Sequence, residues 1–219
     1  MHVYTIELTL LNHLFYNTEN SNGVYTAPFI GDLALTYALR KVLVENWETP
    51  EYRRKPFYQE IKDWGFYVSV ASPVDYTYTE VYTRNTLFNV DGFVNTDAIT
   101  KSSKSPFVSL FYTQGVAVGS VFECQVFSRE PLEIPSVLRV GNGRETLISL
   151  REKSQKPDTL WLNIFTQKEV FNNLGKVADL IQDEPYEKAY VLEQYVLLKY
   201  ISPDTAIKIM EDSLQPVNS

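Results

Sequence analysis

Apolar and polar side chains alternate along residues 2–10 (HVYTIELTL), and this alternation constrains the fold more than any other feature of the chain. One side of the segment carries Tyr4, Ile6, Leu8 and Leu10. Because successive side chains of a strand point to opposite faces of its sheet, the pattern predicts a strand with one buried face. Aromatic and β-branched residues predict further strands in residues 65–72, 76–88, 106–114, 120–127, 137–140 and 147–152.

Helical patterns lie on both sides of the later strands. Residues 30–46 (IGDLALTYALRKVLVEN) place Leu35 and Leu39 one turn apart after Asp32, which we expect to cap the helix. Residues 184–200 (EPYEKAYVLEQYVLLKY) predict a longer helix, and the Ser-Pro pair that follows at 202–203 predicts the start of a short one.

This order of elements predicts an α+β fold with an antiparallel sheet and C-terminal helices, and a ferredoxin-like sheet fits it. The chain has 219 residues, which is enough to bury a sizeable core. We expect one domain, with residues 1–168 as its core and residues 169–219 as a helical C-terminal extension.

The charge of the chain limits the partners that it can bind. A net charge of −7 argues against a protein that coats nucleic acid indiscriminately. Residues 169–219 carry nine acidic and four basic residues, whereas residues 139–156 carry five basic and two acidic ones. A local cationic site is therefore compatible with an acidic chain.

Targeting and redox signals point to the cytoplasm. No segment has the basic start and apolar run of a signal peptide, or the ~20 apolar residues of a membrane span. The single cysteine, Cys124, permits no internal disulfide and alternates with Glu123 and Gln125, as a small core residue does. We expect a soluble cytoplasmic protein with no membrane partner.

Few residues in the chain are suited to catalysis. The histidines are His2 and His13, and no paired-cysteine, H-E-x-x-H or acidic metal-binding pattern is present. A nucleophile elbow and a Walker-type loop are also absent. The carboxylates of Glu7, Glu80 and Glu123 are best explained as a solvated outer face of the sheet. We therefore expect a chain that is not an enzyme and that has neither a metal nor a cofactor.

Single-stranded RNA is better matched by the composition of four short segments. RNA is held by cations and main-chain N–H groups on its phosphates, and its unstacked bases pack on aromatic rings. These groups occur in residues 12–20 (NHLFYNTEN), 52–58 (YRRKPFY), 101–105 (KSSKS) and 139–144 (RVGNGR). The candidate RNA-binding residues are His13, Tyr16, Asn17, Arg53, Arg54, Lys101, Ser102, Ser103, Lys104, Arg139, Gly141, Asn142, Gly143 and Arg144.

Each of these segments also has a simpler explanation. A Gly-rich turn closes many hairpins, a basic triplet is commonly a solvated surface, and a Lys/Ser tract is commonly a flexible loop. Two further functions stay open at this point. His13, a tyrosine and a lysine could form a metal-independent ribonuclease, or the chain could be a protein-interaction module that binds no nucleic acid.

Three motifs resemble a known family in their order and spacing. They are YTIELTLLNHLFY at residues 4–16, PFIGDLALTYALRK at residues 28–41 and IPSVLRVGNGRETLISL at residues 134–150. Together they resemble the small subunit of type I-D CRISPR surveillance (Cascade) complexes, a member of the Cas-five branch of the RAMP superfamily. The resemblance covers roughly residues 1–150.

The resemblance implies a ferredoxin-like or RRM-like RAMP core with a thumb-like hairpin, for which residues 89–113 are the candidate. It implies a non-catalytic subunit in antiviral defence that binds the 5′ handle of crRNA and caps the filament of repeated backbone subunits. The large subunit and, within the assembled complex, target DNA would be further partners. Some members of the same branch cut CRISPR repeat RNA, so endoribonuclease activity is the alternative that the resemblance itself raises.

Overall fold

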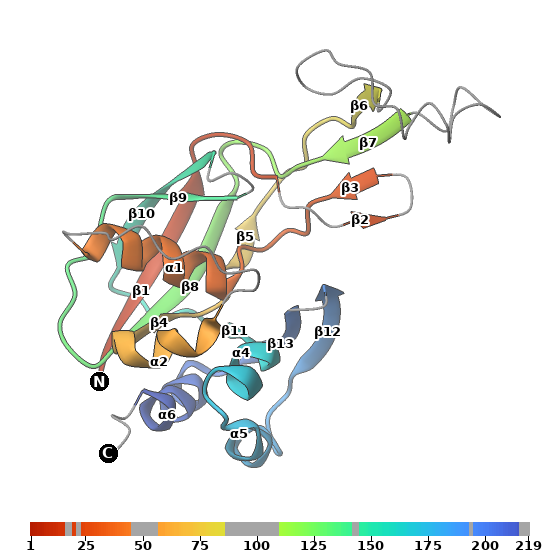
Figure 1. The fold of residues 1–219 in the computed structure, drawn as a ribbon. Coiled ribbons are helices and arrows are strands. Elements are labelled where there is room, and N and C mark those ends of the chain that lie inside the picture. The colour runs from red at the N-terminus through yellow and green to blue at the C-terminus, as the bar shows by residue number, and fades with distance from the viewer. Residues whose placement is uncertain are drawn as a thin grey trace.

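Figure 1 shows the fold in a computed structural model. The structure describes residues 1–15, 19–20, 23–44, 57–85, 110–141, 145–192 and 195–214. The strands are β1 (His2–Leu10), β2 (Glu19–Asn20), β3 (Gly23–Tyr25), β4 (Phe66–Val68), β5 (Ser72–Asp75), β6 (Tyr82–Asn85), β7 (Leu110–Gln114), β8 (Val121–Ser128), β9 (Val137–Val140), β10 (Thr146–Lys153), β11 (Leu160–Asn163), β12 (Glu187–Leu192) and β13 (Tyr195–Ile201). The helices are α1 (Asp32–Leu43), the 3-10 helix η1 (Tyr58–Glu60), α2 (Ile61–Trp64), α4 (Ile164–Glu169), α5 (Leu174–Leu180) and α6 (Pro203–Ser213). Of these helices, none is long and apolar enough to span a membrane.

The main sheet has the strand order β4-β8-β1-β10-β9, and β5 also pairs with β8. All of its pairings are antiparallel, so the predicted antiparallel sheet is confirmed. The helix α1 connects β1 to β4, and β8 lies between these two strands, which is the arrangement of a split βαβ unit. Between β8 and β10 the described residues form β9 and no helix.

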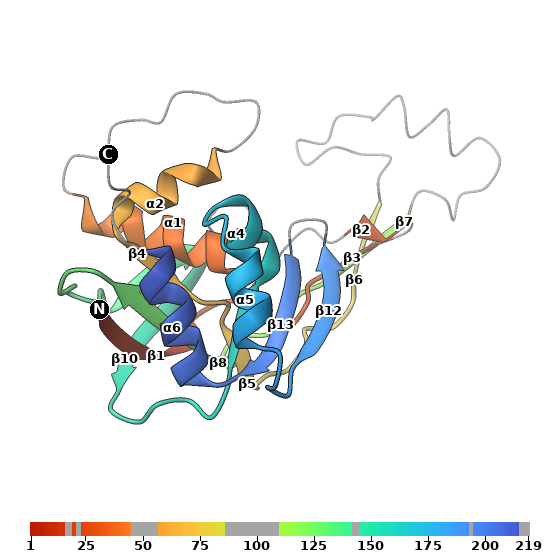
Figure 2. The ribbon, with the colours of Figure 1, turned by 90° about the horizontal axis from the view of Figure 1, so that it is seen from below.

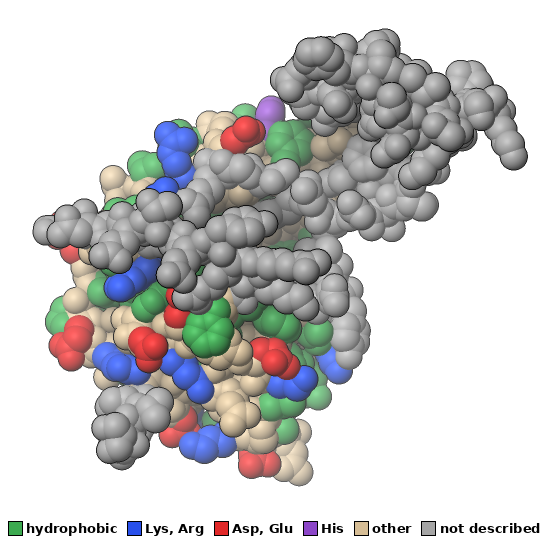
Figure 3. Space-filling view, viewed as in Figure 1, with side chains coloured by type: hydrophobic (Ala, Val, Ile, Leu, Met, Phe, Trp, Pro, Cys, Tyr) green, Lys and Arg blue, Asp and Glu red, His purple; other side chains and the backbone are tan. Residues whose placement is uncertain are grey.

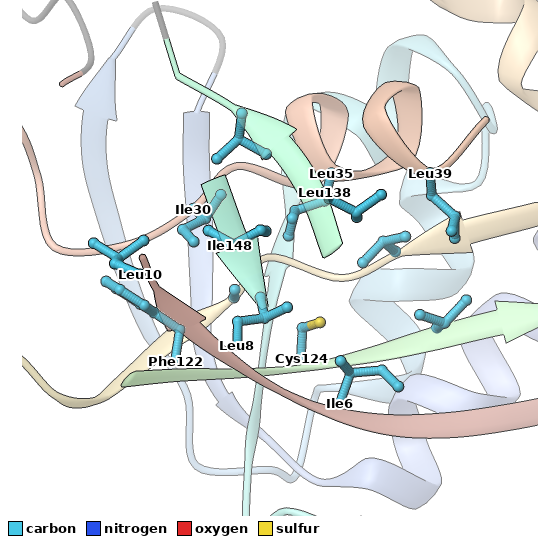
Figure 4. Packing of buried hydrophobic residues seen from close by; sticks show 14 of the residues in the cluster. Ile6, Leu8, Leu10, Ile30, Leu35, Leu39, Phe122, Cys124, Leu138 and Ile148 are labelled. Carbon is cyan, nitrogen blue, oxygen red and sulfur yellow. The ribbon is translucent and has the colours of Figure 1, made fainter. Parts of the chain in front are cut away.

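One face of this sheet packs against α1. The register aligns Ile6 with Cys124 and Leu8 with Leu150, which brings the apolar side chains of β1 onto the face predicted from their alternation. In Figure 4 these side chains and those of Leu35 and Leu39 on α1 point toward one another. Burial raises the pKa of the Cys124 thiol well above its ordinary value, as expected for an inert core cysteine.

The start of α1 differs from the prediction in one respect. The N-cap residue is Gly31, and Asp32 is the first residue of the helix rather than its cap. The Asp32 side chain is fully buried and bonds other elements. Leu35 and Leu39 are both buried, as their spacing predicts.

A second, smaller sheet extends from one end of the main sheet, at the upper right of Figure 1. Its order is β2-β3-β7-β6, in which β6 and β7 are antiparallel and β3 and β7 are parallel. The predicted thumb at residues 89–113 reaches this sheet through β7, and residues 89–109 lie outside the described residues.

The C-terminal part of the chain is where the sequence interpretation was wrong. Residues 187–192 and 195–201 form the antiparallel strands β12 and β13 instead of the long helix predicted for residues 184–200. Their tyrosines, valines and isoleucine favour strands, and Leu197 and Leu198 are both buried, so no alternation marks the strand. The short helix predicted at residues 202–203 is confirmed as α6, because the Ser202 side chain caps it by accepting a bond from the N–H of Thr205.

These C-terminal elements share a core with the main sheet. The strands β11, β13 and β12 form a third sheet, and Figure 2 shows α4, α5 and α6 clustered beside it. Tyr67 of β4 and Phe127 of β8 pair across the main sheet and pack with Leu162, Leu198 and Met210. Residues before and after position 168 therefore contribute to the same hydrophobic cluster.

A buried carboxylate joins α1, β4 and the C-terminal elements. The Asp32 carboxylate accepts hydrogen bonds from the Tyr67 hydroxyl (2.9 Å), the Asn163 side-chain amide (2.9 Å) and the Thr166 hydroxyl. Burial raises the pKa of the Asp32 carboxyl, although these three bonds act in the opposite direction. A carboxyl group this deeply buried is tolerated because neighbouring donors replace the hydrogen bonds that it would make to water.

Replacing Asp32 by Ala should lower the free energy of unfolding by at least about 3 kcal/mol, because three buried donors lose their acceptor at about 1–3 kcal/mol each. Urea unfolding measures the loss. Asp32→Asn keeps the volume and one acceptor oxygen and should cost less. A loss below about 1 kcal/mol in the alanine variant would show that the donors find other partners.

The same carboxyl predicts how stability depends on pH. Because its pKa is raised on folding, the folded protein binds more protons at Asp32 than the unfolded chain does. The stability from this group is complete below the ordinary aspartate pKa of about 3.9 and is lost as the pH rises through the raised folded value. The unfolding free energy of the unaltered protein minus that of Asp32→Asn should therefore fall as the pH rises above about 4. A difference that grows with pH would contradict the assignment.

Candidate nucleic-acid interface

The Gly-rich turn follows β9 directly. Val140 of β9 pairs with Thr146 of β10, and Gly141 begins the connection between the two strands. Gly141 has a φ of +85°, and a Cβ at this position would lie 2.9 Å from the Thr146 hydroxyl oxygen. Both observations require glycine here, because the backbone is left-handed and the Thr146 side chain fills the space that a side chain at position 141 would need.

The segment that follows β1 is fastened to this turn by side-chain hydrogen bonds. The Thr146 hydroxyl donates to the main-chain oxygen of His13 at 2.9 Å. The Asn12 side chain accepts from the N–H of Leu147 at 2.6 Å and donates to the carbonyl of Glu145 at 2.9 Å. Thr146 therefore lies between two candidates that the sequence identified separately, His13 and Gly141.

The orientation of His13 is set by another main-chain contact. Its ring is exposed, and the ring nitrogen Nδ1 accepts a hydrogen bond of 3.1 Å from the N–H of Val118. In the neutral ring the proton is therefore on Nε2, which is left as a donor. The arrangement suits hydrogen bonding to a ligand from a fixed ring.

Arg139 lies on β9 two residues before the turn. Leu138 and Val140 are buried against α1, so the alternation of the strand directs Arg139 to the opposite face, and its side chain is exposed. Within the described residues Arg139 has no ion pair. By contrast, Arg151 and Lys153 of the neighbouring β10 bond Glu7 and Glu123, respectively.

These two ion pairs also settle the role of the strand carboxylates. Glu7 of β1 lies opposite Glu123 of β8, so the two groups do converge across the sheet. Each is neutralised by a cation from β10, and the hydrogen bond that Lys153 donates to Glu123 raises the pKa of Lys153. Among the described residues no group of three potential ligands could hold a metal ion.

Aromatic rings extend from the turn toward the smaller sheet. The His13 and Phe15 rings are edge to face at 6.4 Å, and Phe15 and Tyr82 are edge to face at 6.3 Å. A Cβ on Gly115 would lie 2.6 Å from both the Phe15 ring and the Leu14 carbonyl oxygen, so glycine leaves the space for Phe15. Tyr82 is 48% exposed. The structure thus places exposed aromatic surface beside the turn.

The remaining candidates lie in parts of the chain that the structure does not describe. Outside the described residues lie Tyr16, Asn17, Arg53, Arg54, Lys101, Ser102, Ser103, Lys104, Asn142, Gly143 and Arg144. Figure 3 shows Lys and Arg side chains interspersed with Asp and Glu over the described part of one face, so no field of a single sign covers it. Positive charge that attracts an anion must therefore be local.

Sequence reasoning missed the groups that hold the site together, which are Asn12, Thr146, Phe15 and Tyr82. An asparagine shortly after the end of a strand commonly bonds main-chain groups, so Asn12, two residues beyond β1, did carry a signal. Thr146 carried none, because its hydroxyl acquires a role only through the pairing of β9 with β10 and the return of the segment after β1.

Comparison with known proteins identifies the family. Residues 1–195 match the family described as "Type I-D CRISPR-associated protein Cas5/Csc1". The chain belongs to this family. No curated protein sequence matches it. Membership in the Cas5/Csc1 family supports the assignment of the chain as a subunit of a CRISPR effector complex, and it confirms the family resemblance of the three sequence motifs.

Two solved structures share partial likeness with this Cas5/Csc1 chain. A chain of the "Cryo-EM structure of the Type III-B Cmr-beta bound to cognate target RNA and AMPPnP, state 1" has 9% identity and a TM-score of 0.46, with 96% of this chain and 90% of that chain covered. A chain of the "Type IV-B CRISPR Complex" has 6% identity and a TM-score of 0.39, with 71% and 92% covered.

The contact between Gly141 and Thr146 can be tested with a matched pair of glycines. Gly119 has a φ of +84°, and a Cβ there would meet nothing within 4 Å. Gly119→Ala and Gly141→Ala should therefore share a backbone strain of about 1–3 kcal/mol. Gly141→Ala should cost about 1 kcal/mol more in urea unfolding, because it displaces the hydroxyl that bonds His13. Equal losses, or an unchanged Val118 amide signal in the NMR spectrum of Gly141→Ala, would contradict this role of the turn.

Proposed function

We propose that this Cas5/Csc1-family chain is a non-catalytic subunit of a type I-D CRISPR surveillance complex, and that it binds the 5′ handle of crRNA at the end of β9. The observation that carries the proposal is the joining of His13 and Gly141 by Thr146, beside the exposed Arg139. Family membership supplies the biological setting.

The chemistry of this end of the sheet matches single-stranded RNA. Gly141 and Gly143 carry no side chains of their own, which lets a phosphate reach main-chain N–H groups of the turn, and Arg139 and Arg144 supply charge-assisted hydrogen bonds. Phe15 and Tyr82 offer rings for unstacked bases. These contacts read backbone and shape, while discrimination between targets comes from base pairing with the guide.

The topology supports a ferredoxin-like RAMP core in which the second helix is replaced. The split unit formed by β1, α1 and β4 with β8 inserted is the first half of such a core. In the second half β9 occupies the connection from β8 to β10. Because this connection contains a strand instead of the second helix, we place the ligand at the Gly-rich turn where that strand ends.

The other partners follow from charge. RNA would occupy the local cationic end, and the acidic residues 169–219 would face protein, for which the large subunit is our candidate. In this role the chain caps the filament of repeated backbone subunits and helps to dock target DNA.

The double variant Arg139→Ala, Arg144→Ala should bind a repeat-derived RNA oligonucleotide at least about 100-fold more weakly, because it loses two hydrogen bonds from charged donors at about 1.5–3 kcal/mol each. The dependence of log K on log salt should become shallower by about 0.7 for each lost phosphate contact. Fluorescence anisotropy between 50 and 500 mM salt, a range across which screening changes strongly, measures both quantities.

Arg151→Ala is the matched control, since Arg151 lies on the adjacent strand but is neutralised by Glu7. It should leave affinity and slope nearly unchanged. Equal effects of the double variant and of Arg151→Ala would refute the proposed binding of RNA by Arg139 and Arg144.

The proposal of a non-catalytic chain has its own test, in which repeat RNA incubated with the purified chain and a chelator should stay intact. Cleavage that disappears in His13→Ala would instead establish the metal-independent ribonuclease.

A further inference from the structure

A groove of about 650 Å³ lies between α1 and the edge strand β9. The helix wall is a single stripe in which Ala34, Ala38 and Val42 recur every four residues, with Lys41 beside them. The other wall is formed by consecutive residues of β9 from 137 to 140, together with Gly141. A small-residue helix stripe next to a strand edge leaves room for one more strand between them.

The edge of β9 presents free main-chain groups toward this groove. The N–H of Leu150 donates to the carbonyl of Ser136 at 2.8 Å, and the register continues with Leu138 opposite Ile148. Because hydrogen-bonded and non-bonded pairs alternate in an antiparallel ladder, Val137 and Arg139 direct their N–H and C=O groups away from β10. Within the described residues neither strand nor loop bonds these groups.

The charge of the groove is positive. Lys41 is the charged side chain of the helix wall, and Arg139 of the strand wall directs its side chain to the opposite face of β9, where alternate side chains of an added strand would also point. Neither residue forms an ion pair within the described part of the chain. No described carboxylate lines the groove. An occupant that carries acidic side chains is therefore favoured.

We infer that this groove binds an extended, acidic peptide segment of a partner protein, which adds as a strand to β9 and packs its apolar side chains against Ala34, Ala38 and Val42. Main-chain pairing supplies affinity in this mode, and the pockets for alternate side chains supply specificity. A second copy of β9 is disfavoured as the occupant, because it would bring two Arg139 side chains together.

A nucleic acid matches the groove less well than a peptide does. The edge offers donors and acceptors that alternate at the spacing of a strand, which a sugar-phosphate backbone lacks. Tyr37 is the aromatic residue of the lining, and its ring already packs edge to face on Trp64 at 4.8 Å while its hydroxyl donates to Glu60 at 2.6 Å. It is therefore held away from the stacking position that a base requires.

The inference does not rest on the proposed RNA site. Arg139 is the one side chain that we assign to both the RNA site and the groove. The test therefore uses Val137, whose outward N–H lines the groove and is not part of the RNA site. Proline at Val137 removes this donor at the first residue of an edge strand, where proline is tolerated. Val137→Ala removes the side chain but keeps the donor, and is the matched control.

The experiment places a benzophenone amino acid at Val42, which is 52% exposed at the helix wall, in the fully assembled effector complex. Irradiation should give a crosslink to an acidic, extended segment of one partner subunit. Val137→Pro should lower the crosslink yield about fivefold, the equivalent of one lost main-chain hydrogen bond of about 1 kcal/mol, and Val137→Ala should not. Lys41→Glu, which leaves the strand intact, should lower the yield by a similar factor.

Three results would overturn the inference: a crosslink to RNA or DNA, a crosslink within the chain itself, and no crosslink at all. A crosslink to a protein that is insensitive to both Val137→Pro and Lys41→Glu would overturn it as well.

If Val137→Pro does not fold, Lys41→Glu and hydrogen exchange at the Arg139 amide provide the test. Strand addition must slow the exchange of this amide in the complex relative to the free chain. RNA affinity should be unchanged in Val137→Pro, so failure of this inference is distinguishable from failure of the RNA proposal.

Discussion

The buried carboxylate of Asp32 is the interaction on which the rest of the structure depends. It joins the first turn of α1 to Tyr67 on the main sheet, to Asn163 at the end of β11 and to Thr166 in α4. Hydrophobic clusters alone leave the angle and register of a helix loosely determined, because apolar contacts have no direction. Three directed bonds to one buried acceptor fix α1 against β4 and β11, and the position of α1 in turn defines the groove beside β9.

The second half of the sheet has a different consequence, because β9 follows β8 where a split βαβ unit would be completed by a helix. A helix there would cover the sheet and bury the end of β10. A four-residue strand occupies this place instead, and the segment with Asn12 and His13 is hydrogen-bonded to Thr146 and Leu147 of β10 beside it. The candidate interface is thus a product of topology, and the bonds from Thr146 and Asn12 only fix its detail.

How far the sequence predicts this structure depends on whether local patterns match the final environment. The alternation of Ile6, Leu8 and Leu10 predicts β1 correctly, because these three side chains are all buried on one face, whereas the polar residues of the other face range from buried Thr5 to partly exposed Glu7. The same reasoning fails at residues 184–200, because Leu197 and Leu198 are buried on opposite faces of β13 and their run cannot be told from a helical one by period alone. The local chemistry of Asp32 predicts a helix cap. Its hydrogen-bond partners in the structure are Tyr67, Asn163 and Thr166, and tertiary packing brings these residues to it. The hydrogen bonds of Thr146 are invisible to sequence for the same reason.

The strand β9 unites these arguments within four residues. Leu138 and Val140 are buried against α1, Arg139 points to the opposite face, and the main chain of Val137 and Arg139 faces outward along the edge. A strand that is buried on both faces exposes no side chain that could contact a ligand, and an isolated loop has no fixed geometry. An edge strand packed on one side only is rigid and still exposes a side chain, an edge and a turn. The edge position of β9 therefore explains why the RNA site and the peptide groove that we propose both involve the same short segment.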